Sequence, residues 1–276
     1  MAYELQTKAE IVTARRILIQ GPPNSGKTES LMTWPRPIHI QVFPGEKGHA
    51  TIPRGQPDIF PYVWGTDAAT GLSSHTVVQQ VETLTWEILG GKYGPVITFA
   101  GDGFHKYYWF VLDWMSGGAL SRGEEIGAGG KDEWAAARIH NRTRDYVRFY
   151  IQRILSSAVP YVVFNTWDGR EADKPGAKTF HIYPDLPGKS AKEIVGEFSA
   201  TLHSTVEWHL RQPKGKAPAY WLLKPEGEVW GASVKVPFEI WDKLPVRIAQ
   251  SLPVFEQTLE AAWKSASASV NPASNG

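Results

Sequence analysis

Short apolar runs alternate along this chain with longer stretches in which apolar residues recur every three or four positions. Short runs bounded by turn residues are typical of buried strands, and the longer period is typical of amphipathic helices. The predicted strands cover residues 16–20, 37–43, 59–64, 95–100 and 161–165. The predicted helices cover residues 75–89, 104–114 and 132–157. This order predicts an α/β fold with a mostly parallel central sheet flanked by helices.

The pattern changes in the last third of the chain. Alternate residues are apolar from Phe198 to Leu210, and a second apolar run covers 220–223. Such alternation is typical of half-exposed strands, so we expect C-terminal antiparallel strands to extend the sheet. We expect polar surface loops at 116–130, which is rich in glycine, and at 167–176. A helix at 246–263 would close one domain over 1–264, followed by a disordered tail at 265–276, which is rich in Ser, Ala and Asn.

A phosphate-binding motif follows the first predicted strand. Residues 21–28 read Gly-Pro-Pro-Asn-Ser-Gly-Lys-Thr and match the pattern G-x-x-x-x-G-K-[ST] at every fixed position. Backbone N–H groups of such a loop surround phosphates at the start of a helix, which Pro35 stops here. Lys27 neutralises phosphate charge and the Thr28 hydroxyl binds Mg²⁺. The sequence therefore predicts that the chain binds ATP with Mg²⁺. The nucleotide-binding residues are predicted to be Gly21, Pro22, Pro23, Asn24, Ser25, Gly26, Lys27, Thr28 and Glu29.

A P-loop site also needs a carboxylate that holds Mg²⁺ and a group that activates water. Asp102 follows an apolar run and is the predicted metal carboxylate, although Gly101 stands where a hydrophobic residue is usual. The next residue is Gly103, so a glutamate beside Asp102 is absent. Glu46, just past the second predicted strand, is the predicted base, and a solvated turn is the alternative for it.

Two polar residues end the strand predicted at 161–165. Asn165 and Thr166 follow the buried run Val162-Val163-Phe164, and their side chains can hydrogen-bond a γ-phosphate. A polar pair that only caps the strand is the alternative. The eight histidines are scattered without metal-ligand spacing.

Composition excludes several classes of protein. The chain of 276 residues has no cysteine, which excludes disulfides, thiolate zinc sites and a cysteine nucleophile. Its formal net charge of +1 means that any contact with nucleic acid must be local. No apolar run approaches the length of a membrane span, and the early acids Glu4 and Glu10 do not fit a signal peptide. We therefore expect a cytoplasmic protein without a membrane partner.

The order of these motifs resembles the RecA-like ATPase core, and in particular phage-encoded RecA-like proteins associated with single-strand annealing. The matching pieces are the P-loop, Glu46, Asp102, the strand ending at Thr166 and the segment 184–200, and they span roughly residues 10–240. The resemblance implies a RecA-like P-loop NTPase core. It also implies that Glu46 activates water and that the polar residue at the strand end, Thr166, couples the γ-phosphate to DNA binding.

The resemblance further implies partners. Two loops of RecA-like proteins line a path for single-stranded DNA, and here they would be 116–130 and 167–178. The second loop contains the predicted DNA-binding residues Trp167, Arg170, Lys174 and Lys178. An aromatic ring beside cations suits stacked bases and phosphates. Acidic neighbours dilute this charge, so a solvated loop is the alternative. A single-strand-binding protein would be a further partner.

Self-association into a ring or filament is also implied by the resemblance. RecA-like sites are commonly completed by a cation from the neighbouring subunit. The resemblance places that cation at Lys224, with Lys235 in reserve. A solvated lysine at the end of a strand is the alternative for both. The predicted catalytic residues are thus Glu46, Lys27, Thr166 and Lys224.

These features give one leading function and three alternatives. The leading hypothesis is a DNA-stimulated ATPase that acts on single-stranded DNA in phage recombination or replication, in the host cytoplasm. A small-molecule P-loop kinase should have a lid with converging arginines, and 117–130 contains only Arg122. A non-hydrolysing nucleotide-binding scaffold is favoured if Glu46 points away from the site. A replicative helicase motor is the fourth possibility.

Overall fold

The computed structural model describes residues 16–52, 55–64, 71–126, 134–172, 180–186, 190–207 and 219–270. The strands in these residues are β1 (Arg16–Gln20), β2 (Ile38–Val42), β3 (Ile59–Val63), β4 (Thr98–Asp102), β5 (Tyr161–Thr166), β6 (Asp168–Ala172), β7 (Phe180–Pro184), β8 (Ala200–Val206), β9 (Ala219–Leu222), β10 (Ser233–Val234) and β11 (Arg247–Ala249). The α-helices are α2 (Lys27–Ser30), α3 (Ser74–Leu89), α4 (Phe104–Met115), α5 (Ala135–Leu155), α6 (Ser190–Val195), α7 (Phe238–Lys243) and α8 (Leu252–Val270).

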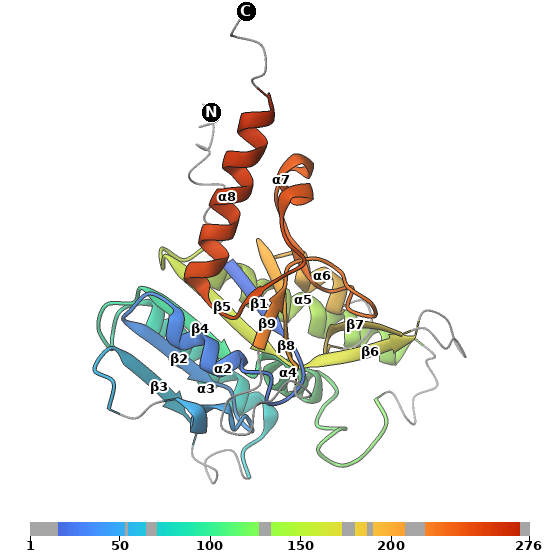
Figure 1. Cartoon of the computed structure of the whole chain (residues 1–276). Coiled ribbons are helices and arrows are strands. Elements are labelled where there is room, and N and C mark those ends of the chain that lie inside the picture. Colours follow the sequence, from blue (N-terminus) through green and yellow to red (C-terminus); the bar gives the residue numbers. More distant parts are fainter. Residues whose placement is uncertain are drawn as a thin grey trace, which may run out of the picture.

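The described strands form a nine-stranded sheet in the order β11-β9-β8-β1-β5-β4-β2-β3, with β10 paired to β8 beside that path. The strands from β8 to β3 pair in parallel, whereas β9, β10 and β11 pair antiparallel. The strand before the P-loop, β1, lies near the middle, and β5 separates it from β4 (Figure 1). The predicted fold class is confirmed: a mostly parallel sheet flanked by helices and extended by antiparallel strands.

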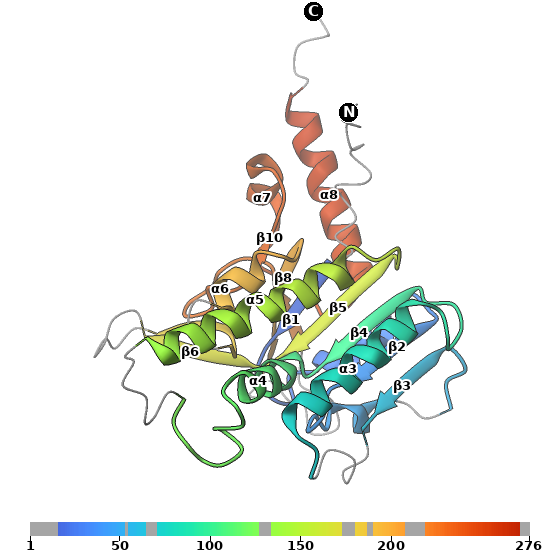
Figure 2. The same ribbon diagram turned by 180° about the vertical axis from the view of Figure 1, so that it is seen from behind.

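The sheet separates two hydrophobic cores, because successive residues of a strand point to opposite faces. In β1, Ile17 and Ile19 pack in the core that contains α8, and Leu18 packs in the core formed with α3, α4 and α5. Figure 2 shows α3 and α5 across one face of the sheet, and Figure 1 shows α2 and α8 on the opposite face. Both faces of β1 are therefore covered, which places its carboxyl end and the P-loop at a rigid edge.

Three of the sequence predictions need correction near this edge. β4 begins at Thr98 and includes Asp102 as its last residue, so the strand predicted at 95–100 lies further along the chain. The loop predicted at 167–176 is in part a strand, because β6 pairs antiparallel with β7. The alternation after Phe198 was expected to give antiparallel strands, and β8 does pair antiparallel with β9 and β10, but it also runs parallel to β1.

The C-terminal region also differs from the prediction. The helix expected at 246–263 is preceded by β11, which pairs with β9, and α8 starts only at Leu252. Buried Leu259, Ala262 and Ala266 continue the helical period of α8. The helix therefore reaches Val270, inside the segment expected to be a disordered tail, and residues 271–276 lie outside the described part.

The glycine-rich loop expected at 116–130 is held at its start. Residues 116–123 form turns, and residues 127–130 lie outside the described part. The Ser121 backbone N–H donates to Asp113 Oδ1 at 2.9 Å, and the Ser74 hydroxyl donates to the same carboxylate. Asp113 thereby fixes this loop to α3 and α4.

Candidate functional site

The P-loop joins the end of β1 to α2 at the carboxyl edge of the sheet. The loop turns through two left-handed residues, Asn24 at φ 62° and Gly26 at φ 84°, and α2 then begins at Lys27. A 3-10 turn over Leu31–Thr33 follows, and the chain becomes extended at Trp34 before Pro35, as the sequence predicts. Because α2 is a single turn, the helix dipole is small here, and a phosphate bound at this loop would be held mainly by Lys27 and the loop N–H groups.

Lys27 points into the loop. Its Nζ donates to the carbonyl oxygens of Gly21 and Pro22, both at 2.7 Å, and the residue is 8% exposed. Burial lowers the pKa of Lys27 to about 8, although Asp102, Asp168 and Glu46 act in the opposite direction. The loop thus holds a poorly solvated ammonium group, which phosphate oxygens would stabilise.

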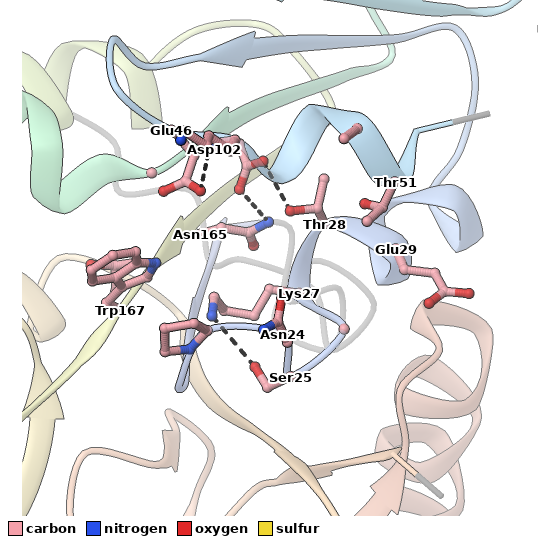
Figure 3. Close-up of a pocket in the computed structure, with 16 residues that line it drawn as sticks. Asn24, Ser25, Lys27, Thr28, Glu29, Glu46, Thr51, Asp102, Asn165 and Trp167 are labelled. Carbon is pink, nitrogen blue, oxygen red and sulfur yellow. Dashed lines mark hydrogen bonds between the residues drawn. The ribbon is translucent and has the colours of Figure 1, made fainter. Parts of the chain in front are cut away.

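Asp102, the last residue of β4, connects helix α2 and strand β5 at the site. Its Oδ2 accepts a hydrogen bond from the Thr28 hydroxyl at 2.9 Å, and its Oδ1 accepts one from Asn165 Nδ2 at 3.2 Å. Asp102 and Asn165 are also register partners at the ends of β4 and β5. Figure 3 shows the Asp102 carboxylate between these two side chains. The parallel pairing therefore delivers the carboxylate to the P-loop hydroxyl across 74 residues.

The charge on Asp102 is poorly stabilised by the protein. Burial raises the pKa of Asp102 to about 6, and the nearby Glu46 raises it further against the effect of its two hydrogen bonds. The residues fit Mg²⁺, because the hydroxyl of Thr28 and the carboxylate of Asp102 are hard oxygen donors and a cation would relieve this excess negative charge. Thr28 would bind the ion directly and Asp102 through water.

Glu46 lies in the turn after β2 and reaches the same cavity beside Asp102 (Figure 3). A Cβ atom at Gly103 would lie 2.8 Å from the Cβ of Glu46, so only glycine fits there. Glu46 thus occupies the space that a side chain after Asp102 would fill, which explains why no glutamate follows Asp102. Gly101 is small for a similar reason, since a Cβ there would lie 2.6 Å from the Phe164 ring. The catalytic role of Glu46 stays a prediction.

The end of β5 presents polar atoms that lack partners. Within the described residues, Asn165 Oδ1 and Thr166 Oγ1 are buried and make no hydrogen bond. Both residues line the cavity. Buried polar atoms without partners are costly and commonly meet a ligand or water. Their position fits the predicted contact with a γ-phosphate.

Trp167 is the first residue after β5, and it also lines the cavity. Its ring stacks on His105 with centroids 4.5 Å apart, and Lys106 Nζ lies 4.8 Å from the ring centre. The backbone N–H of Trp167 donates to His105 Nδ1 at 3.4 Å. The indole is therefore packed at the rim of the P-loop cavity rather than free on a loop.

The other predicted DNA-binding residues lie in or beyond β6. Arg170 lies in β6, and Lys174 and Lys178 lie outside the described residues. DNA binding by this segment stays a prediction.

Lys224 does not line the cavity of its own chain. Leu222 pairs with His203, which pairs with Gln20 at the end of β1. After Leu222 the chain of β9 runs away from the edge of the sheet that holds the P-loop, because β9 is antiparallel to β8. Lys224 therefore lies further from the P-loop than Gln20 does along the strand direction. Its Nζ is 5.5 Å from the Trp241 ring centre. The Lys235 ammonium donates to the carbonyl oxygen of Gly196. A role for either lysine in a neighbouring subunit stays a prediction.

The P-loop, Glu46, Asp102 and the residues at the end of β5 line one cavity of about 460 Å³, within the usual range for small-molecule sites. The described residues that line it are Pro23, Asn24, Ser25, Gly26, Lys27, Thr28, Glu29, Glu46, Lys47, Ala50, Thr51, Asp102, Gly103, Asn165, Thr166 and Trp167. The sequence did not indicate that Lys47, Ala50 and Thr51 line the cavity. The one feature of the sequence that could have pointed to them is that they closely follow Glu46. Glu29 was expected to contact nucleotide, but its carboxylate points away from Lys27 (Figure 3).

Comparison with known proteins adds little to this geometry. No family model matches the chain, and no curated protein matches its sequence. The chain is similar to a solved structure of the assembled ATPase EscN from the type III secretion system of enteropathogenic E. coli, with 14% identity and a TM-score of 0.39. The match covers 70% of this chain and 43% of that one, so the chain spans less than half of the EscN chain.

Proposed function

We propose that this protein binds ATP with Mg²⁺ at the P-loop cavity and hydrolyses it. The observation that carries the proposal is the 2.9 Å hydrogen bond between Thr28 of the P-loop and Asp102 of β4. A hydroxyl beside a strand-end carboxylate is the pair of groups that shares Mg²⁺ with phosphates in P-loop proteins, and their contact here supports the proposal. Lys27 and Glu46 lie in the same cavity.

Each residue then has a distinct task. Lys27 and the loop N–H groups bind the β- and γ-phosphates, and Thr28 and Asp102 would hold Mg²⁺, which would supply positive charge beside the phosphate oxygens. Glu46 accepts a proton from water as the water oxygen attacks the γ-phosphorus. The bond between that phosphorus and the bridging oxygen breaks, which releases ADP and phosphate. Thr166 and Asn165 contact the γ-phosphoryl group from the end of β5.

The test is phosphate release from ATP by the whole protein with and without Mg²⁺. We expect turnover only with Mg²⁺, and turnover without it would contradict the metal assignment. Phosphate transfer to an added small molecule, with no release to water, would favour the kinase alternative. The structure gives that alternative little support, since no arginine is among the described cavity residues and Arg122 pairs with Glu124 at 2.7 Å.

We further propose that single-stranded DNA stimulates this hydrolysis in phage recombination or replication. The RecA-like order of motifs supports the idea, and so does the position of Trp167, whose ring contacts the cavity rim. Trp167→Ala should weaken binding of a single-stranded oligonucleotide by roughly 1–3 kcal/mol if a base stacks on the indole. A hydrolysis rate that does not change with single-stranded DNA would contradict this proposal and leave the ATPase proposal intact.

Two further features stay predictions. Self-association into a ring or filament would let Lys224 act at a neighbouring site, and specific activity should then rise with protein concentration. The cytoplasmic location also stays a prediction; in the described part of the chain, every helix is too short or too polar to cross a membrane.

A further inference from the structure

The P-loop has one side that lines the cavity and one side that packs against the rest of the fold, here called the protein side. The protein side is held by residues from the C-terminal part of the chain. Ser204, in β8, donates from its hydroxyl to the carbonyl oxygen of Ser25 at 2.7 Å. Gln250, directly after β11, donates from Nε2 to the same oxygen at 2.9 Å. One carbonyl group of the loop therefore accepts two side-chain hydrogen bonds from residues 179 and 225 positions away.

The Gln250 amide also joins this contact to the sheet extension. Its Nε2 lies 2.6 Å from the Ser204 hydroxyl oxygen and 3.1 Å from the carbonyl oxygen of Tyr220 in β9. On the other side of the amide, a Cβ atom added to Gly26 would come within 2.6 Å of Gln250 Oε1. The amide therefore lies directly against the Ser25–Gly26 peptide and ties the loop to β8 and β9.

Peptide geometry gives this contact a consequence for ligand binding. In a trans peptide the C=O and the following N–H point in opposite directions. Because the Ser25 carbonyl is bound on the protein side, the N–H of Gly26 is turned toward the cavity that Gly26 lines. A reversed peptide would instead present a carbonyl oxygen, which repels phosphate.

We propose that Ser204 and Gln250 are positioning residues that fix the Ser25–Gly26 peptide with its N–H aimed at phosphate. This inference rests on the proposed function, in which the cavity binds a nucleoside triphosphate. It adds a role for the antiparallel extension of the sheet, because β9 and β11 hold Gln250 against the loop. Neither residue contacts the ligand in this arrangement.

The experiment measures binding of ATP and of inorganic pyrophosphate, each with Mg²⁺, by titration calorimetry. Gln250→Met keeps the side-chain length and removes the donor, and Ser204→Ala removes the hydroxyl. A hydrogen bond of this kind typically changes an equilibrium by about twofold to tenfold. We expect each variant to lose affinity by about that factor for both probes equally, since pyrophosphate has only the phosphates. The KM for ATP should rise while kcat changes little. Gln257→Ala, at an exposed glutamine of α8, is the matched control.

The outcomes separate this inference from the proposed function. If the unaltered protein binds neither ATP nor pyrophosphate, the proposed function fails. If it binds both, and both variants bind as tightly as Gln257→Ala does, the positioning role is overturned. A loss for ATP without a loss for pyrophosphate would also overturn it, because the effect would not come from the phosphate loop. If Gln250→Met loses its fold by circular dichroism, Ser204→Ala decides on the same criteria.

Discussion

The two sides of the P-loop differ in the kind of contact that they make. The cavity side contains charged groups: Lys27, Asp102 and Glu46 lie together, and the pKa values of the first two are displaced toward neutrality. The protein side is held by neutral hydrogen bonds from Ser204 and Gln250. Charged groups respond to pH, metal and phosphate, whereas neutral bonds to a carbonyl oxygen do not titrate. The comparison suggests that chemistry is confined to one side of the loop and shape to the other.

The largest difference between the two sides should appear in turnover. Glu46→Gln keeps the shape of the side chain and removes the base, so we expect ATP binding to persist while hydrolysis falls by roughly 10²–10⁴. Phosphate release at saturating ATP measures the effect, with Glu260→Gln on the exposed face of α8 as the control. A variant that hydrolyses ATP at the normal rate would place the base elsewhere.

The next largest effect is a loss of affinity for ATP with Mg²⁺ at acid pH. We expect it to arise from the cavity side of the loop alone. The pKa of Asp102 is raised to about 6 in the nucleotide-free protein, and Mg²⁺ needs the charged carboxylate. Below about pH 6 a proton must therefore leave Asp102 when the metal binds, so affinity for ATP with Mg²⁺ should fall as pH drops below that value. Because one proton is displaced, the affinity can fall by at most tenfold for each unit of pH.

Asp102→Asn is the control for that measurement. Phosphate groups themselves take up a proton near pH 6, so some acid dependence comes from the nucleotide. The variant should bind ATP with Mg²⁺ more weakly at neutral pH and show only this residual dependence, whereas Gln250→Met should keep the full acid dependence at lower affinity. Parallel profiles for Asp102→Asn and the unaltered protein would exclude Asp102 as the titrating group.

A smaller effect is expected at alkaline pH. The pKa of Lys27 is lowered to about 8, and bound phosphates should raise it because they stabilise the ammonium form. ATP binding then takes up a proton as pH rises through about 8, so affinity should decrease above that pH and change little near pH 7. Calorimetry in buffers of different ionisation enthalpy measures this uptake directly. Proton release at pH 8.5 would have the wrong sign for Lys27.

Much of the cavity side was predictable from the sequence, for a physical reason. The P-loop is contiguous, and Asp102, Glu46 and Thr166 lie at or just beyond the carboxyl ends of buried strands, which meet at one edge of a parallel sheet. The apolar runs marked those strands. The protein side left no such mark, because Ser204 and Gln250 meet Ser25 only after the chain has folded.

Polar residues in a buried strand explain why the pairing of β8 with β1 was not predicted. In β8 both faces are buried, yet its polar residues Thr201 and His203 imitate the alternation of a half-exposed strand. The His203 Nε2 lies 3.3 Å from Asp168 Oδ2 at the start of β6, which partners this buried ring. The parallel pairing of β8 with β1 was missed because buried polar positions near a site resemble exposed ones. The strand β6 was missed because its sequence, Asp-Gly-Arg-Glu-Ala, has no apolar pattern.

The most direct test of the central claim is ATP binding by Lys27→Ala. This change removes the ammonium group from the charged side of the loop and leaves Ser204 and Gln250 in place. We predict that the folded variant shows no detectable binding of ATP with Mg²⁺, while Lys92→Ala, at an exposed lysine paired with Glu87, binds like the unaltered protein. Unchanged ATP affinity in folded Lys27→Ala would contradict the assignment of this cavity as a nucleotide site.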